Sequence, residues 1–310
     1  MMLVLGRSAP EIPGNIDPFV YHRVVQSMSG GLEFYPSLDE VFRAYGMGPV
    51  DSVLAVRSPL GFWFLALIGN DNVTWLLMLA AATVAALLLA RTLHNPVLAI
   101  TVILFFESVG QVAWTAPELW ASILVVAAVG LALDEQWIPA AVTATIATSV
   151  RELAVLVLVG IAVSQRRSGR SVVAPVVGLG VVTAFYLAHW TRASSYLVPV
   201  GEGRQADLFG TGSFPSGVLA MMSTWLPGGV VVGVILFAAT LAWAHRRDRL
   251  ALLAPVLALV LAGVLVDRPE WATFVIPLTL ALGLDELVDR IGRWCSLHWR
   301  GANRSAAARS

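Results

Sequence analysis

The chain contains no lysine, so all 20 of its basic residues are arginines. Twenty acidic residues balance them, and the formal net charge is zero. Charged residues make up only 13% of the 310 residues, about half of the share that a soluble domain carries. A chain without excess positive charge lacks the electrostatic field that holds a nucleic-acid backbone. Nucleic acid is therefore not an expected partner.

Cysteine is almost absent, since Cys295 is the only one, and an internal disulfide is excluded. The five histidines are scattered, and no His-x-x-x-His or Asp-x-Asp pair occurs. Pairs of this kind usually build a metal site from protein ligands. We expect no cofactor that the protein itself holds, although a divalent cation bound partly by a substrate phosphate is compatible with the chain.

Apolar residues are what the chain has in excess. They make up 57% of the sequence, and the mean hydropathy is +0.77, which argues against a soluble globular protein. A bilayer core about 30 Å thick requires roughly 20 apolar residues per helix. Four runs in the second half approach this length: 172–190, 226–244, 250–266 and 272–288. The sequence predicts an all-α, polytopic protein of the lipid bilayer with roughly eight to ten membrane helices, some short or broken.

Arginines gather in the short polar segments 165–171 and 245–249 and in the tail 290–310. Arginine-rich short loops mark the cytoplasmic side of a membrane protein. Alternation of the helices then places segment 191–225 outside as a loop. We expect a multi-pass protein of the cytoplasmic membrane with a cytoplasmic C-terminus and an extracytoplasmic active face.

The first half of the chain allows two arrangements. Residues 60–69 are too short to cross alone, and residues 139–163 form a long apolar run with Arg151 and Glu152 at its middle. In one arrangement this run is a single helix with an ion pair at the midplane, and Glu118 is cytoplasmic. In the other, two short helices meet at the charged pair on the outer side, where Glu118 also lies. The second is favoured because midplane charges cost several kcal/mol, whereas broken helices can line a wet cavity.

The chain begins with a short apolar stretch, 1–5, followed at once by polar residues. This stretch is too short to span and lacks the basic start of a signal peptide. We expect residues 1–10 to be the remnant of a first membrane helix. Residues 11–58 then form an extracytoplasmic loop, and residues 59–289 form the multi-spanning membrane domain.

Within that first loop, residues 21–30 and 38–45 have amphipathic patterns. The patterns predict two short helices in the membrane interface, with apolar side chains such as Val24 and Phe42 turned to lipid. Helices in this position would form the floor of a cavity.

Asp17 has two interpretations. An aspartate just past the end of a membrane helix is partly desolvated, and it can accept a proton from a sugar hydroxyl held against it. Aspartate before proline is also a common helix N-cap, with Pro18 in the first helical position. The residue alone leaves both roles open.

Three motifs of the first loop occur in a fixed order. Tyr21 follows Asp17 by four residues, residues 31–36 read Gly-x-x-x-Tyr-Pro, and Pro59-Leu60 opens the next apolar run. This order resembles the first periplasmic loop of the GT-C superfamily of integral-membrane glycosyltransferases that use polyprenyl-phosphate sugars. The likeness is to the actinobacterial, mannosyltransferase-like branch.

Later motifs extend the resemblance. Gly110-Gln111-Val112 is similar to a Gly-Gln-Val-Asn segment of that branch, with Ala113 in place of the Asn. Segments 116–121 and 149–152 are similar to the two polar steps that follow it. Members of the family are usually longer and have a complete first helix, which fits the expectation of a missing first transmembrane helix.

The resemblance implies a polyprenyl-phosphate sugar as donor and an extracytoplasmic glycan, lipid or protein as acceptor. Asp17 would be the catalytic base that deprotonates the acceptor hydroxyl, with direct displacement and inversion at the anomeric carbon. Arginine would hold the leaving phosphate, because a guanidinium fits phosphate oxygens in a bidentate way. The expected substrate-binding residues are Tyr21, Arg57, Gln111, Glu118, Arg151, Glu152 and Arg268.

A structural role competes with phosphate binding for three of these arginines. Arg151 could instead pair with Glu118 or Glu152 and so make a broken helix tolerable. Arg57 could anchor the loop at the lipid headgroups, and Arg268 could belong to a short turn.

Two other classes of function compete with the enzyme. A transporter or lipid flippase would place polar groups at the midplane between repeated halves, and the sequence shows no internal repeat. A catalytically silent membrane partner is the other alternative, and the short first helix is its main support.

Overall fold

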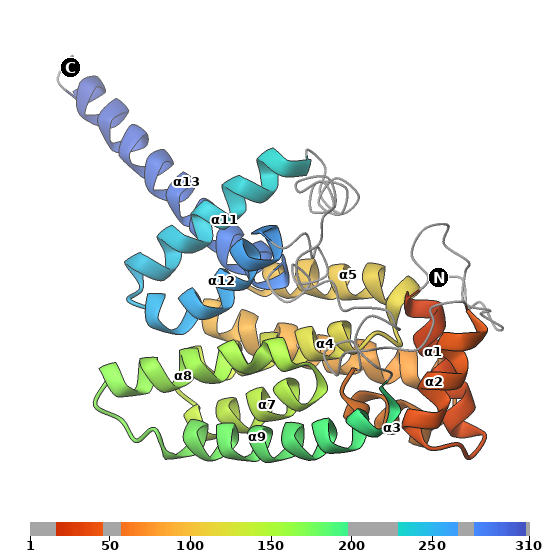
Figure 1. The fold of residues 1–310 in the computed structure, drawn as a ribbon. Helices are drawn as coiled ribbons and strands as arrows, with labels where there is room; N and C mark the ends of the chain where they lie inside the picture. Colours follow the sequence, from red (N-terminus) through yellow and green to blue (C-terminus); the bar gives the residue numbers. More distant parts are fainter. Residues whose placement is uncertain (1–16, 46–56, 198–228, 266–275, 308–310) are drawn as a thin grey trace.

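The computed structural model describes residues 17–45, 57–197, 229–265 and 276–307. Every regular element in these ranges is helical (Figure 1), which confirms the all-α prediction. The expected helix remnant at residues 1–10 lies outside the described residues, and so does most of the expected outer loop 191–225.

Three short helices lie together at one end of the molecule: α1 (Asp17–Ser29), α2 (Phe34–Ala44) and α3 (Pro59–Ile68) (Figure 1). Val24, Phe34 and Phe62 are buried in a small core that these helices share. Two helices occur where the sequence predicts them, but the expectation for their apolar sides is wrong. Val24 and Phe42 are buried in this core and do not face outward, because α3 packs against α1 and α2.

Longer helices form the body of the molecule. They are α4 (Asp71–Leu93), α5 (Pro96–Ala113), α6 (Pro117–Leu133), α7 (Trp137–Val150), α8 (Val155–Arg167), α9 (Val173–Ala193), α11 (Gly229–Arg246), α12 (Leu250–Leu265) and α13 (Ile276–Ala307). The four apolar runs of the second half correspond to α9, α11, α12 and α13, although α13 continues through most of the tail (Figure 1).

Helix α6 is the centre of the packing. Most of its residues are buried, and it packs against α4, α5, α7 and α8. Gly130 allows the close approach to α4, because a Cβ there would lie 3.0 Å from the backbone nitrogen of Leu89. The same helix carries Glu118 in its first turn, so its position fixes one candidate site residue.

Helices α7 and α8 are separate, as the second arrangement of the sequence requires. Helix α7 ends at Val150, and Arg151 has an extended backbone with φ −145° and ψ 117°. A short 3-10 turn, Glu152–Ala154, then leads into α8. The single long helix of the first arrangement is therefore wrong.

Two ends of the bundle can be defined by their ion pairs. At one end, which we call the arginine end, Arg91 meets Asp134, and both Arg170 and Arg249 meet Glu135. The opposite end, which we call the cluster end, brings Glu118 at the start of α6 to Arg151 at the end of α7. Helices α4 to α9 run between these two ends, and consecutive helices run in opposite directions.

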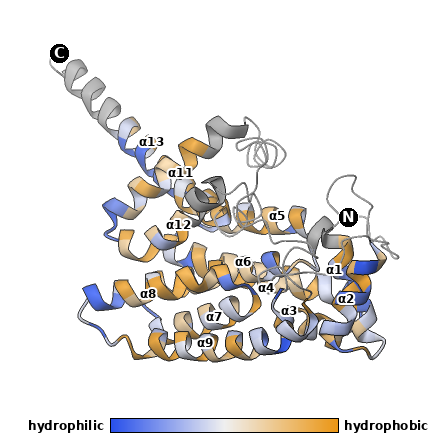
Figure 2. Ribbon diagram, in the orientation of Figure 1, coloured by the Kyte–Doolittle hydropathy of each residue, from blue (hydrophilic) through white to orange (hydrophobic). Residues whose placement is uncertain are grey.

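By length and composition, two helices in the described part of the chain could cross a membrane: α4, with 23 residues, and the helical segment Val173–Tyr196, with 24 residues. The other apolar helices are shorter. Figure 2 shows apolar residues along most of the bundle helices. On α4, α5, α7 and α9 many of the large apolar side chains are exposed, among them Leu76, Leu87, Ile100, Leu104, Ile138, Val142, Val177 and Leu187.

Candidate functional site

Glu118 and Arg151 form the centre of the candidate site. Glu118 lies in the first turn of α6, where a carboxylate interacts favourably with the helix dipole. Arg151 lies where α7 ends, and its Nε is 2.9 Å from the Oε1 of Glu118. Both residues are buried, with 7% and 3% of their surfaces exposed. The burial makes each charge dependent on the other.

Arg57 and Tyr21 join this pair from two other segments. Arg57 precedes α3, and its Nε lies 3.6 Å from the Oε1 of Glu118. The same Nε donates a hydrogen bond of 3.0 Å to the hydroxyl of Tyr21 on α1. Burial disfavours the charge of Arg57, but Tyr21, Glu118 and Glu152 favour it more strongly and raise its pKa, so Arg57 remains a cation.

Glu152 completes the group that we call the charge cluster: Tyr21, Arg57, Glu118, Arg151 and Glu152. Its Oε1 accepts a hydrogen bond from Nη1 of Arg151, and its side chain is 42% exposed. The two arginines and two glutamates of the cluster have opposite formal charges that cancel. The ion pair that competed with phosphate binding for Arg151 is therefore present in the structure.

Two side chains that the sequence did not single out hold the break beside Arg151. The Oγ of Ser58 donates to the carbonyl of Ser149, and the hydroxyl of Tyr186 donates to the carbonyl of Thr148 over 2.9 Å. Carbonyls at the end of a helix lack helical partners, so these bonds satisfy groups that the break leaves free. Ser58 caps α3, a role typical of a serine before proline, but nothing local indicates its long-range partner.

The structure brings together five of the eight predicted site residues. Asp17 is the first residue of α1, one turn before Tyr21, and Gln111 lies in the last turn of α5. The side chains of Asp17 and Gln111 lie outside what the structure describes, and Arg268 lies outside the described residues.

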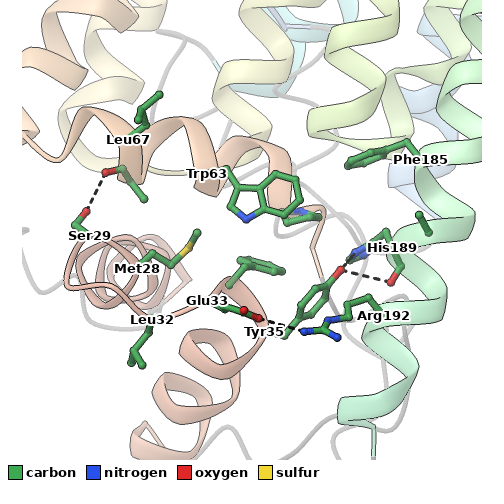
Figure 3. A pocket seen from close by; sticks show the side chains of 14 residues that line it. Met28, Ser29, Leu32, Glu33, Tyr35, Trp63, Leu67, Phe185, His189 and Arg192 are labelled. Carbon is green, nitrogen blue, oxygen red and sulfur yellow. Dashed lines mark hydrogen bonds and ion pairs between the residues drawn. The ribbon is translucent and has the colours of Figure 1, made fainter.

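A pocket of about 690 Å³ lies between α1, α2, α3 and α9 (Figure 3). Pro59 lines this pocket. It directly follows Ser58, whose hydroxyl bonds to the end of α7. Its walls are mainly apolar, and they include Met28, Leu32, Phe34, Trp63, Leu67 and Phe185. We call it the apolar pocket.

Two polar pairs lie at one side of the apolar pocket (Figure 3). The hydroxyl of Tyr35 is 2.8 Å from Nδ1 of His189, and Nη2 of Arg192 is 3.2 Å from Oε2 of Glu33. Tyr35 belongs to the Gly-x-x-x-Tyr-Pro motif, but His189 and Arg192 were not expected to contribute. Their partners are more than 150 residues away in sequence, which no local pattern reveals.

In the described ranges, no three His, Cys, Asp or Glu side chains lie close enough to hold a metal ion. Comparison with family models, with curated proteins and with solved structures gives no match for this chain.

Proposed function

We propose that the protein is a polytopic membrane glycosyltransferase that moves a sugar, mannose or a similar one, from a polyprenyl-phosphate donor to an extracytoplasmic acceptor. One observation carries this proposal: Tyr21, Arg57, Glu118 and Arg151 converge from four distant segments, one helical turn from Asp17. Tyr21, Glu118 and Arg151 belong to the sequence motifs that resemble the GT-C superfamily.

The outer surface of the bundle supports a membrane setting. Exposed large apolar side chains on several neighbouring helices form a surface that water does not favour and that lipid does. Arg91, Arg170 and Arg249 lie at the arginine end. The positive-inside rule makes that end cytoplasmic and the cluster end extracytoplasmic.

In the proposed reaction, Asp17 takes the proton of the acceptor hydroxyl. The hydroxyl oxygen attacks the anomeric carbon from the face opposite the phosphate, and the bond between that carbon and the phosphate oxygen breaks. The products are the glycosylated acceptor with inverted configuration and polyprenyl phosphate. A cation beside the leaving phosphate stabilises the charge that develops there.

Arg57 is the better phosphate contact of the cluster, because its side chain is 18% exposed whereas that of Arg151 is 3% exposed. Arg151 acts as a positioning residue that holds Glu118 and, through it, Arg57. The apolar pocket is suited to the isoprenoid chain of the donor, with Trp63 and Phe185 in its walls and Arg192 at its polar side.

The test is an assay of membranes with polyprenyl-phosphate mannose, in which consumption of the donor is measured. Asp17→Asn should lower the rate by about a hundredfold or more, as loss of a general base does. The matched control is Asp39→Asn on α2, which removes a carboxylate that pairs with Arg43 at the surface and should leave the rate unchanged. An unchanged rate in Asp17→Asn would contradict the proposal.

A second candidate is a catalytically silent membrane partner. The specific observation in its favour is that Glu118 and Glu152 already neutralise both arginines of the charge cluster. It predicts no donor consumption by the wild-type protein and no effect of Asp17→Asn.

A further inference from the structure

A second pocket, of about 390 Å³, lies at the cluster end between α1, the α3–α4 turn and Trp114. We call it the polar pocket. It is separate from the charge cluster, and Ser29 is the residue that it shares with the lining of the apolar pocket. Its polar side chains are Gln26, Ser29, Asn70, Asp71, Asn72 and Thr74.

The lining selects against charged ligands. It contains one carboxylate and no arginine, so it does not suit a phosphate or another anion. A single carboxylate is also too little for a divalent cation, which prefers several oxygen ligands of charged groups. Amides, hydroxyls and one carboxylate together offer both donors and acceptors, which is what a neutral ligand with many hydroxyl groups requires.

Much of this hydrogen-bonding capacity is free. Asn70 accepts a hydrogen bond from the backbone of Val73 through Oδ1, which leaves its NH₂ group available. Thr74 donates to the carbonyl of Asn70 and retains its acceptor capacity. Among the residues that the structure describes, the side chain of Asn72 makes no hydrogen bond, and it is exposed.

His22 holds one wall of the polar pocket in place. It is buried, its Nε2 lies 2.7 Å from Nε2 of Gln26, and its ring meets the ring of Trp114 edge to face at 5.1 Å. A wall that is fixed before the ligand arrives loses little conformational entropy on binding.

The polar pocket is distant from the proposed base. Gln26 follows Asp17 by nine residues on the same helix, which corresponds to about 14 Å along the axis. A ligand in the polar pocket is therefore not the group that reacts at Asp17. It can be another part of the same extended molecule.

We infer that the polar pocket binds a neutral sugar unit of the acceptor, away from the reacting hydroxyl, so that the acceptor is a glycan chain. That the sugar belongs to the acceptor rests on the proposed function. Sugar binding itself can be measured without the donor. The sugar unit interacts with the amides of Asn70 and Asn72 and the carboxylate of Asp71, and it packs on Trp114.

The experiment measures binding of methyl mannoside and of mannobiose to the purified full-length protein in nanodiscs, by saturation-transfer NMR and tryptophan fluorescence, with no donor present. Asn72→Ala should weaken binding about tenfold, the effect of one lost hydrogen bond of about 1.4 kcal/mol. The control is Asn95→Ala, a half-buried asparagine that follows the other end of α4 and caps α5. It should leave binding unchanged.

The outcomes separate the two proposals. Sugar binding that depends on Asn72 supports the inference even if donor consumption is absent, a result that would contradict only the proposed enzyme. Absence of binding in the wild-type protein, or binding that Asn72→Ala does not change, overturns the inference. Binding of inorganic phosphate that depends on Asn72 also overturns it, because the pocket would then be an anion site.

Discussion

The two ends of the bundle use the same kinds of ion pair in opposite environments. At the cluster end, Glu118 and Arg151 pair with almost no exposed surface, whereas at the arginine end Arg91 is 65% exposed and Asp134 is 31% exposed. Water screens the second pair and leaves it worth little, but the first pair has lost its hydration and depends on the partner charge. The two ends therefore differ in the burial of their ion pairs, and the buried pair is the one at the candidate site.

The buried pair also explains the shape of the chain around it. Arg151 interrupts what would be one continuous apolar helix of α7 and α8, and its extended backbone brings the side chain to Glu118. A continuous helix would place two charged side chains in an apolar run without this partner. The break between α7 and α8 therefore allows Arg151 to pair with Glu118, and the charge cluster depends on it.

The largest expected effect comes from removing one partner at the cluster end. Glu118→Gln leaves Arg151 buried beside a neutral amide and should lower the free energy of unfolding by about 3–5 kcal/mol. Asp134→Asn, the matched change at the arginine end, should lower it by about 1 kcal/mol or less. Chemical denaturation of both variants in the same micelles measures the difference.

A double variant distinguishes the loss of charge pairing from a general packing defect. Glu118→Gln combined with Arg151→Gln removes both charges and should be more stable than Glu118→Gln alone, because the buried Arg151 cation is gone and Arg57 and Glu152 still balance each other. Equal losses for Glu118→Gln and Asp134→Asn would contradict the distinction between the two ends.

A smaller effect is expected at Tyr21. Tyr21→Phe removes the hydroxyl that accepts the hydrogen bond of Arg57 and keeps the ring that packs against Phe62. The free energy of unfolding should fall by about 1.5–3 kcal/mol, as for a hydrogen bond to a charged group. Tyr45→Phe at the C-terminal end of α2 serves as the control, since Tyr45 is exposed and packs on Phe19. Unchanged stability in Tyr21→Phe would remove Tyr21 from the cluster.

The smallest effect concerns pH. Burial lowers the pKa of His22, the nearby carboxylate of Asp71 opposes this shift, and Arg23 adds to it. The folded protein therefore keeps His22 neutral where the unfolded chain binds a proton, so stability is complete above about pH 6.5 and falls as the pH is lowered through that value. Thermal unfolding at pH 8 and pH 5.5 measures the loss.

His22→Gln should reduce that pH dependence, whereas the same change at the exposed His94 of the arginine end should preserve it. The opposite result, a loss of pH dependence only in the His94 variant, would contradict the assignment to His22.

Of two arrangements, the sequence favoured the one in which the helix breaks and in which Arg151 and Glu118 lie at the same end of the bundle, as the structure shows. Both followed from one physical rule, since ionisable side chains inside apolar runs are costly unless they meet partners. The sequence did not predict that Val24 and Phe42 are buried, because an amphipathic helix has the same pattern whether its apolar side meets lipid or protein.

Contacts between distant segments could also not be predicted from the sequence. Tyr186 bonds to the carbonyl of Thr148, and Arg192 pairs with Glu33 across more than 150 residues. Neither contact leaves a local signal, because each depends on how α9 packs beside α7 and α2. Such contacts require the three-dimensional structure.

We propose that the charge cluster lies on the extracytoplasmic side of the membrane. Cys295, the only cysteine of the chain, is exposed on α13 beyond the arginine end, and Ser195 is exposed at the cluster end. The most direct measurement treats intact cells with a membrane-impermeant maleimide. We predict that Ser195→Cys in a Cys295→Ser background is labelled in intact cells, and that native Cys295 is labelled only after permeabilisation. Labelling of Cys295 in intact cells, with Ser195→Cys protected, would contradict the account.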